Sequence, residues 1–199
     1  RNPLMPGIDE FDAEFFQMTQ READIRDPQH RVFMEVSHDA VQHAGYSPQT
    51  LPGVVGVFAG GATNGYAEYN VRANERVSRQ VGPLAIATGN HLDYLATGLA
   101  YKLNFTGPAL NVSTACSTSL VAIHLASSAL RAGECDVAVA GGVSVEMPYG
   151  RGYRWTPGSI VSRDGICRPF DSRASGTVFG NGCGVLVLKR LSDARRDRD

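Results

Sequence analysis

The sequence lacks a charge imbalance and long apolar runs. Its 199 residues carry 19 Lys and Arg against 20 Asp and Glu, for a formal net charge of -1. A chain so close to neutral gives no electrostatic reason to expect nucleic acid or an anionic membrane as a partner. No apolar run reaches the roughly 18 to 20 residues that a membrane span needs. These absences favour an ordinary globular protein.

Cysteine is scarce, and metal ligands do not cluster. The four cysteines are far apart and form no CxxC pair, and a chain of this length does not depend on disulfides. We therefore expect reduced thiols and a cytoplasmic protein. Zinc needs Cys and His ligands with short spacers, which the five histidines do not provide, so no metal site is expected. These residues are Cys116, Cys135, Cys167 and Cys183, and His30, His38, His43, His91 and His124.

The chain also lacks an initiator methionine. It begins with Arg1, Asn2 and Pro3, without the basic and then apolar segment of a signal peptide. We therefore expect a piece of a longer protein, truncated at both ends.

Apolar periodicity predicts two clear helices. Asp27 and Pro28 form a helix start signal, and apolar residues then recur at helical spacing as far as Gly45. A second helix is expected from residue 91 to residue 101, with Asn90 as its cap. Residues 62–83 between them are expected to be irregular or weakly helical.

Four short apolar runs, rich in β-branched residues, are expected to be strands. They cover residues 54–59, 109–114, 135–140 and 184–188. The third strand is expected to end at Gly141 and Gly142. Strands that alternate with helices predict an α/β domain with a mainly parallel sheet.

The most informative segment joins the second of these strands to a helix. Small residues at 115–119 lead into a helix that extends to about Arg131 and is apolar on nearly every side, as expected inside a domain. Cys116 is expected in its first turn, where free backbone N–H groups and the helix dipole lower the pKa of a thiol. The same N–H groups could hold an oxyanion after attack on a carbonyl. From position alone, an inert cysteine packed in the core is the alternative.

None of the five histidines is expected to take part in catalysis. His124 lies eight residues after Cys116, about 12 Å away along a helix at ~1.5 Å per residue, which is too far for proton exchange with the thiol. It is expected in the core or in a pocket wall. His30, His38 and His43 fall on the first helix, where solvated or packing roles are expected. His91 opens the second helix without an evident partner.

Several segments carry signatures of one enzyme family. Residues 112–122, around Cys116, resemble the nucleophile segment of β-ketoacyl synthases, the condensing enzymes of polyketide and fatty-acid synthesis. Asn181 departs from the family pattern, since many relatives carry an acidic residue there. Further segments are similar to ketosynthase domains, especially those of modular type I polyketide synthases: residues 27–31, 133–136, 140–143, 164–165, 167–171 and 176–182.

The resemblance implies a thiolase-like fold, layered αβαβα, in which two similar α/β halves pack together. Residues 1–199 would be mainly the N-terminal half, and the two catalytic histidines of relatives lie in the second half. The resemblance also implies a homodimer in which residues 109–113 and the helix ending near Tyr101 meet their twins across a two-fold axis. Asn111 and Val112 are then expected at the interface.

The resemblance further implies a reaction for the complete domain. Cys116 would attack an acyl thioester on the phosphopantetheine arm of an acyl carrier protein. A malonyl unit on a second arm would then lose carbon dioxide and extend the acyl chain by Claisen condensation. No bound cofactor is expected, because the arm arrives with the carrier protein. Acyl thioesters, the carrier protein and neighbouring synthase domains are the implied partners, and the fragment alone is expected to be inactive.

Two other functions remain open from the sequence. A non-elongating ketosynthase would bind and transfer an acyl chain through Cys116 without decarboxylation. A thiolase-fold enzyme that acts on coenzyme A substrates is disfavoured by the polyketide-type signatures. The sequence of the second half would distinguish a non-elongating ketosynthase from a condensing enzyme.

Overall fold

The computed structural model describes residues 4–63 and 65–199, and its centre is a four-stranded sheet. Arg1 to Pro3, from which truncation was inferred, lie outside the described residues. The strands are β1 (Val55–Gly61), β2 (Ala109–Asn111), β3 (Val137–Ser144) and β4 (Gly182–Lys189), in the order β2-β1-β3-β4. β1 pairs in parallel with β2 and β3, while β4 is antiparallel to β3. The predicted mainly parallel sheet is confirmed.

Seven α-helices lie in the described part of the chain. Asp27 caps the long helix α2 by accepting a hydrogen bond from the Gln29 amide, as its start signal predicted. Residues 62–83, apart from the undescribed residue 64, contain a π-helical turn (Ala67–Arg72) and a short helix, in line with the expectation. The helices are α1 (Gln20–Ile25), α2 (Pro28–His43), α3 (Glu75–Gln80), α4 (Pro83–Asn90), α5 (Asp93–Leu103), α6 (Thr118–Ala132) and α7 (Leu191–Asp197).

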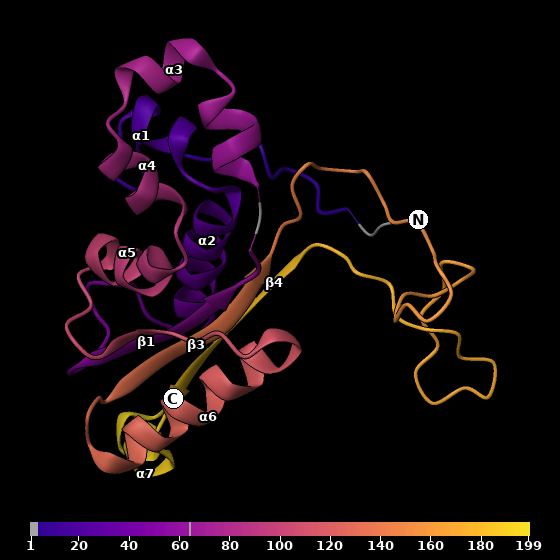
Figure 1. The fold of residues 1–199 in the computed structure, drawn as a ribbon. Helices are drawn as coiled ribbons and strands as arrows, with labels where there is room; N and C mark the ends of the chain where they lie inside the picture. Colours follow the sequence, from indigo (N-terminus) through magenta and orange to yellow (C-terminus); the bar gives the residue numbers. More distant parts are fainter. Residues whose placement is uncertain (1–3, 64) are drawn as a thin grey trace.

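The two faces of the sheet are covered unequally (Figure 1). Along β1, Val57 and Ala59 face a large core shared with α2 and α5, whereas Phe58 faces a smaller core beneath α6. α6 is the helix that follows Cys116. Residues 145–181 leave the sheet as a long excursion with little regular structure before the chain returns as β4 (Figure 1).

Asn90 and the pair Gly141 and Gly142, which were predicted to mark the ends of elements, have other roles. Asn90 does not cap α5: it is the last residue of α4, and its side chain donates to the Ile25 and Ile86 carbonyls, each at 2.8 Å. β3 does not end at Gly141 and Gly142 but continues to Ser144. An added Cβ at Gly141 would lie 2.2 Å from the Gly184 carbonyl oxygen, so glycine here permits close strand pairing rather than a turn.

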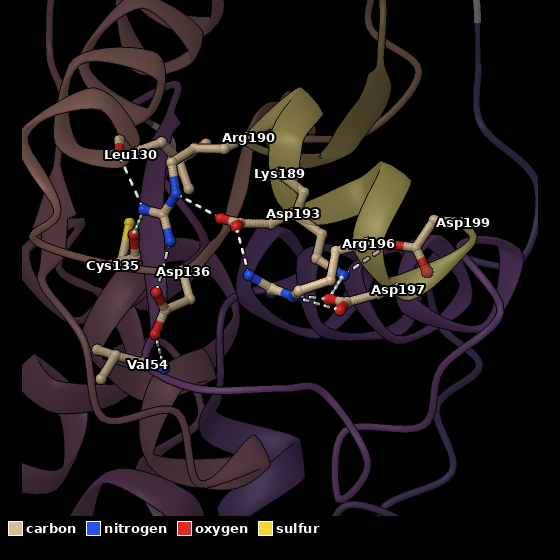
Figure 2. Close-up of polar contacts among 10 residues, drawn as sticks. All are labelled: Val54, Leu130, Cys135, Asp136, Lys189, Arg190, Asp193, Arg196, Asp197 and Asp199. Atoms are coloured by element: carbon tan, nitrogen blue, oxygen red, sulfur yellow. Dashed lines mark hydrogen bonds and ion pairs between the residues drawn. The ribbon is translucent and has the colours of Figure 1, made fainter.

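An arginine clamp joins the last turn of α6 to the starts of β1 and β3 (Figure 2). The Arg190 guanidinium donates to the Leu130 and Cys135 carbonyls at 2.9 and 2.7 Å and to the Asp136 carboxylate at 2.6 Å. The other Asp136 oxygen accepts from the Val54 amide at 2.9 Å. The Val54 amide and then Arg190 lower the pKa of Asp136. The clamp adds a second donor to the Leu130 carbonyl, which also accepts from the Gly133 amide at 3.3 Å.

Candidate active site

Cys116 lies on a sharp elbow between β2 and α6. β2 ends at Asn111, and Cys116 is the middle residue of a 3₁₀ turn, Ala115–Ser117, directly before α6. Ala115 has a φ of 53°, in the left-handed region that non-glycine residues seldom adopt. The Thr114 amide donates to Thr118 Oγ1 at 3.0 Å, which ties the entrance of the elbow to the helix. The Cys116 side chain is exposed.

Three expectations about this segment need correction. The strand ends three residues earlier than predicted, and Cys116 precedes the helix rather than lying in its first turn. The N-cap residue Ser117 makes no side-chain bond to the first amides of α6, and the Thr118 amide donates to the Ala115 carbonyl within the elbow. α6 is not buried on nearly every side: Leu120 is 71% exposed and Leu125 is also exposed.

The elbow opens into a cavity of about 960 Å³. Its walls are the carboxyl-terminal ends of β1 and β3, the elbow, the first five residues of β4 (182–186) and part of the 145–181 excursion. Most of the wall is backbone, small side chains and apolar side chains such as Ile123, Ile160 and Phe179. A site at the carboxyl ends of parallel strands is the usual place for ligands in α/β sheets. The cavity has room for an extended, largely apolar substrate beside the Cys116 sulfur.

Glycine lets the sheet come close to the elbow. A Cβ on Gly60 would lie 2.1 Å from the Thr118 methyl group and 2.3 Å from the Val112 carbonyl oxygen. A Cβ on Gly142 would lie 3.1 Å from the Ser119 Cβ. The absence of side chains at these two positions therefore sets the distance between β1, β3 and the start of α6.

The other thiols are less suited to attack a substrate. Burial raises the pKa of Cys135, and burial raises the pKa of Cys183 to about 12. Cys167 is exposed but does not line the cavity. A thiol reacts as its thiolate, so buried thiols with raised pKa values are poor nucleophiles. Of the four cysteines, all of which lie in the described part of the chain, only Cys116 combines exposure with a place in the cavity wall.

No histidine lines this cavity within residues 4–63 and 65–199. The expectation that His124 lies in the core or a pocket wall is wrong, because it is exposed on α6. His30 is buried, and neither ring nitrogen has a hydrogen-bond partner in the described part of the chain. Burial and then the positive charge of Arg26 lower the pKa of His30 to about 3. His43 and His91 are exposed, and His38 packs edge-on against Phe15 with ring centroids 4.9 Å apart.

Two further segments singled out in the sequence have structural roles. Ser162, which is fully buried, donates to Asp164 at 2.8 Å, and the same carboxylate accepts from Arg168 at 2.8 Å. These bonds hold together the excursion that supplies Ile160 to the cavity. Asn181 accepts from the Glu146 amide at 2.9 Å. Of the cavity residues Ile160 and Phe179, Phe179 lies in the signature segment 176–182, whereas Ile160 carries no pattern that could have marked it in the sequence.

Membrane helices and metal sites are both absent from the described part of the chain. None of its helices combines the length and the apolar character needed to cross a bilayer. No three potential metal ligands among His, Cys, Asp and Glu lie together there.

Comparison with known proteins gives a consistent answer. Residues 1–194 match the family model described as the N-terminal domain of β-ketoacyl synthase. The chain is 44% identical, over 98% of its length, to one subunit of the phenolphthiocerol/phthiocerol polyketide synthase of Mycobacterium tuberculosis, of which it covers 13%. It is also 44% identical to a different subunit of the synthase of the same name from Mycobacterium bovis, of which it covers 10%.

Solved structures agree with this family match. The ketosynthase from module 6 of the bacillaene synthase of Bacillus subtilis 168 superposes with a TM-score of 0.80 at 38% identity. Ketosynthase twelve of the bacillaene polyketide synthase of Bacillus amyloliquefaciens gives a TM-score of 0.84 at 31% identity. Each comparison covers 98% of this chain but only 32% and 34% of the solved chains.

Proposed function

Because the chain belongs to the β-ketoacyl synthase family, we propose that it carries the nucleophile of a ketosynthase domain in a polyketide synthase. Its fold is thiolase-like, and the chain covers the N-terminal half of that fold. The complete domain would be an acyltransferase of the 3-oxoacyl-carrier-protein synthase type. The observation that carries the proposal is the exposed Cys116 at an elbow that opens into a cavity of about 960 Å³.

In the first step, the Cys116 thiolate attacks the carbonyl of an acyl thioester on phosphopantetheine. A carbon–sulfur bond forms to Cys116, and negative charge moves to the carbonyl oxygen. The backbone N–H of Cys116, at the elbow directly before α6, would help to stabilise that oxyanion. When it collapses, the bond to the phosphopantetheine sulfur breaks, and that thiolate leaves and takes up a proton. The product is an acyl-enzyme.

In the second step, a malonyl thioester on a carrier protein loses carbon dioxide, and the resulting enolate carbon attacks the acyl-Cys116 carbonyl. The Cys116 thiolate is released, and a 3-oxoacyl thioester remains on the carrier. In relatives the second half of the fold supplies the two histidines for this step. The described half contributes the nucleophile, oxyanion donors and part of the acyl cavity. The fragment alone should therefore not condense.

The proposed partners are an acyl carrier protein and the neighbouring domains of the synthase. The curated relatives are subunits much longer than this chain, which supports a place within a multidomain protein. We also propose a homodimer and a cytoplasmic location. No resident cofactor is proposed, because phosphopantetheine is part of the substrate.

The test is mass spectrometry of the complete ketosynthase domain mixed with an acyl-carrier thioester. Cys116 should gain the acyl group, and Cys116→Ala should abolish loading without unfolding the domain. Cys167→Ala, which removes an exposed thiol outside the cavity, is the matched control and should load normally. Acylation of Cys135, Cys167 or Cys183 in place of Cys116 would refute the assignment.

Adding malonyl-carrier protein to the loaded domain tests the second step. Release of carbon dioxide together with a 3-oxoacyl product identifies an elongating enzyme. A loaded Cys116 that passes its acyl group to a carrier without releasing carbon dioxide identifies the non-elongating alternative.

A further inference from the structure

The cavity beside Cys116 is bounded by the carboxyl-terminal ends of β1 and β3, where the regular pairing of these two strands ends. β1 and β3 pair as far as Gly61 and Val143, and β4 begins opposite Ser144. Regular pairing of β1 with β3 ends at these points, although the Ala62 amide still donates to the Val143 carbonyl at 3.2 Å. The cavity wall includes the last residues of both strands, Gly60 to Gly61 and Ala140 to Ser144, and beyond β1 it includes Ala62 and Thr63. The shape of the cavity depends on whatever holds these ends in place.

Gln29 reaches these strand ends from helix α2, and its side chain is fully buried. Its Nε2 donates to the Ala62 carbonyl at 2.7 Å, and its Oε1 accepts from the Ala62 amide at 3.2 Å. The same Oε1 accepts from the Val145 amide at 3.2 Å. One carboxamide thus bridges the end of β1 and the end of β3, as a neighbouring strand would.

Asn181, the residue before β4, binds Glu146, which directly follows Val145. Its Oδ1 accepts from the Glu146 amide at 2.9 Å. The residues on either side of it, Gly180 and Gly182, both line the cavity. Successive amides after β3, at Val145 and Glu146, are therefore held by carboxamides from different elements. Neither contact involves the elbow of Cys116.

We propose that Gln29 and Asn181 are positioning residues that set the width of the cavity beside Cys116 and so select the acyl chains it accepts. The acyl-chain part rests on the proposed function, whereas the effect on cavity width does not. Loss of either carboxamide removes contacts that help to hold a strand end, and small displacements in such walls have large effects on bound substrates. The thiol itself should keep its reactivity, since its elbow is held by Thr114 and Thr118.

The experiment compares two alkylating probes on the complete ketosynthase domain. Iodoacetamide reports the reactivity of the Cys116 thiol, and N-dodecyl iodoacetamide also requires space in the cavity. The ratio of the two labelling rates, measured by mass spectrometry, therefore reports cavity shape. Gln29→Met keeps the side-chain volume but loses the three hydrogen bonds to Ala62 and Val145, together with a longer one from Nε2 to the Asp27 carboxylate at 3.4 Å. Gln42→Met, at an exposed position on the same helix, is the matched control.

Gln29→Met and Asn181→Leu should each change the ratio by about fivefold or more, with iodoacetamide labelling within about twofold of wild type. Asn181→Asp keeps an acceptor for the Glu146 amide and should retain the wild-type ratio. Gln42→Met should retain it as well. If Gln29→Met does not fold, the two Asn181 variants decide the question.

An unchanged ratio in Asn181→Leu, or a parallel fall in both labelling rates, would overturn the proposal. The same holds if Asn181→Asp behaves like Asn181→Leu. These readouts need no acyl transfer, so they stand even if the wild-type domain fails to load an acyl group. Such a failure would refute the proposed function and leave the positioning result to be judged on the labelling ratio. If loading succeeds, the variants should also change the preferred chain length of the acyl group.

Discussion

Ala115 holds a strained backbone conformation immediately before the nucleophile. Its φ of 53° brings the Cβ close to the following carbonyl oxygen, which costs an L-residue roughly 1 to 2 kcal/mol. Three contacts among Thr114, Ser117 and Thr118 hold the turn in this form: the bond from the Thr114 amide and two bonds from the Ser117 hydroxyl. Strain of this kind persists where the surroundings over-determine the backbone. Here it turns the Cys116 side chain outward before α6 begins.

Asp164 makes the excursion sensitive to acid. Hydrogen bonds from Ser162 and then Arg168 lower its pKa to about 2, below the ~3.9 of an unfolded chain. The folded state therefore binds fewer protons, and the stabilisation is present above pH ~4 and disappears as the pH falls toward ~2. Asp164→Asn should lower the thermal midpoint at pH 7 and reduce the loss of stability between these pH values. Thermal unfolding followed across pH measures both effects.

The control for this prediction is Glu14→Gln, at an exposed carboxylate in the N-terminal segment. It should leave the pH dependence of unfolding close to that of wild type. An Asp164→Asn protein with the wild-type acid profile would show that Ser162 and Arg168 do not stabilise the carboxylate.

At the residue scale, the sequence identified Cys116 but not the residues that shape its surroundings. A cysteine within a run of small residues after a strand is a local pattern, visible within a few positions. Gln29 contacts Ala62 and Val145 across separations of 33 and 116 residues, which no local pattern reveals. His124 was misplaced because periodicity gives the spacing of a helix but not which of its faces is covered.

Gly60 is the point where β1 passes closest to the elbow. Gly60→Ala would place a methyl group against Thr118 and the Val112 carbonyl, and backbone cannot yield as a side chain can. We expect a loss of about 1 to 3 kcal/mol in the free energy of unfolding and slower acylation of Cys116. Urea denaturation and mass spectrometry of the loaded domain measure these two quantities.

Gly182→Ala is the matched control for Gly60→Ala. Gly182 is also a strand glycine that lines the cavity, but nothing lies within 4 Å of the position that an added methyl group would take. It should unfold like wild type. Equal destabilisation of both variants would mean that glycine is needed for flexibility rather than for close approach.

The Arg190 clamp should stabilise the last turn of α6 more than the rest of the helix (Figure 2). Arg190→Met removes the bonds to the Leu130 and Cys135 carbonyls and leaves Asp136 without its cation. Amide hydrogen exchange at Gly133 and Glu134 should then accelerate by about tenfold, because local opening of that turn becomes easier. Arg195→Met, on the exposed face of α7, should not change it.

At the element scale, the boundaries that failed depend on contacts distant in sequence. Asn90 looked like a helix cap, but it is bound to the Ile25 carbonyl of α1 and closes α4 instead. Gly141 and Gly142 looked like a strand end, but their lack of side chains lets β4 and α6 approach. The start of α2 was correct because Asp27 and Pro28 act on their own helix.

At the scale of the whole molecule, this chain presents uncovered apolar groups on the side of the sheet that carries the cavity. Leu120 on α6, Phe179 in the excursion and Leu186 on β4 are all exposed. The solved ketosynthase chains are about three times as long as the part that this chain matches. The two-half thiolase-like fold was identified from signature segments rather than from periodicity. We expect the second half of that fold to cover these groups.

The edge of the sheet at β2 is the surface where we expect a second copy. β2 pairs with β1 on one side only in the described part of the chain, Leu110 is 49% exposed and Tyr101 on α5 is 83% exposed. Of the two residues predicted at the interface, Asn111 is half-buried and Val112 is buried in the single chain. The Asn111 amide can donate to the Leu92 and Ala59 carbonyls at 3.1 and 3.3 Å. Charging either residue would therefore damage one protomer as well as a dimer.

Leu110→Glu is the cleaner test of the dimer, because Leu110 is exposed in the single chain. An interface with two-fold symmetry contains the substituted residue from both protomers. Two carboxylates in a poorly solvated contact should weaken association by several kcal/mol. Sedimentation of the complete domain should show a wild-type dimer and a Leu110→Glu monomer at micromolar concentration. Leu191→Glu, exposed on α7 after the opposite edge strand, should remain dimeric. A wild-type domain that sediments as a monomer would refute the proposed dimer. A Leu110→Glu variant that stays dimeric would show that the interface does not include β2.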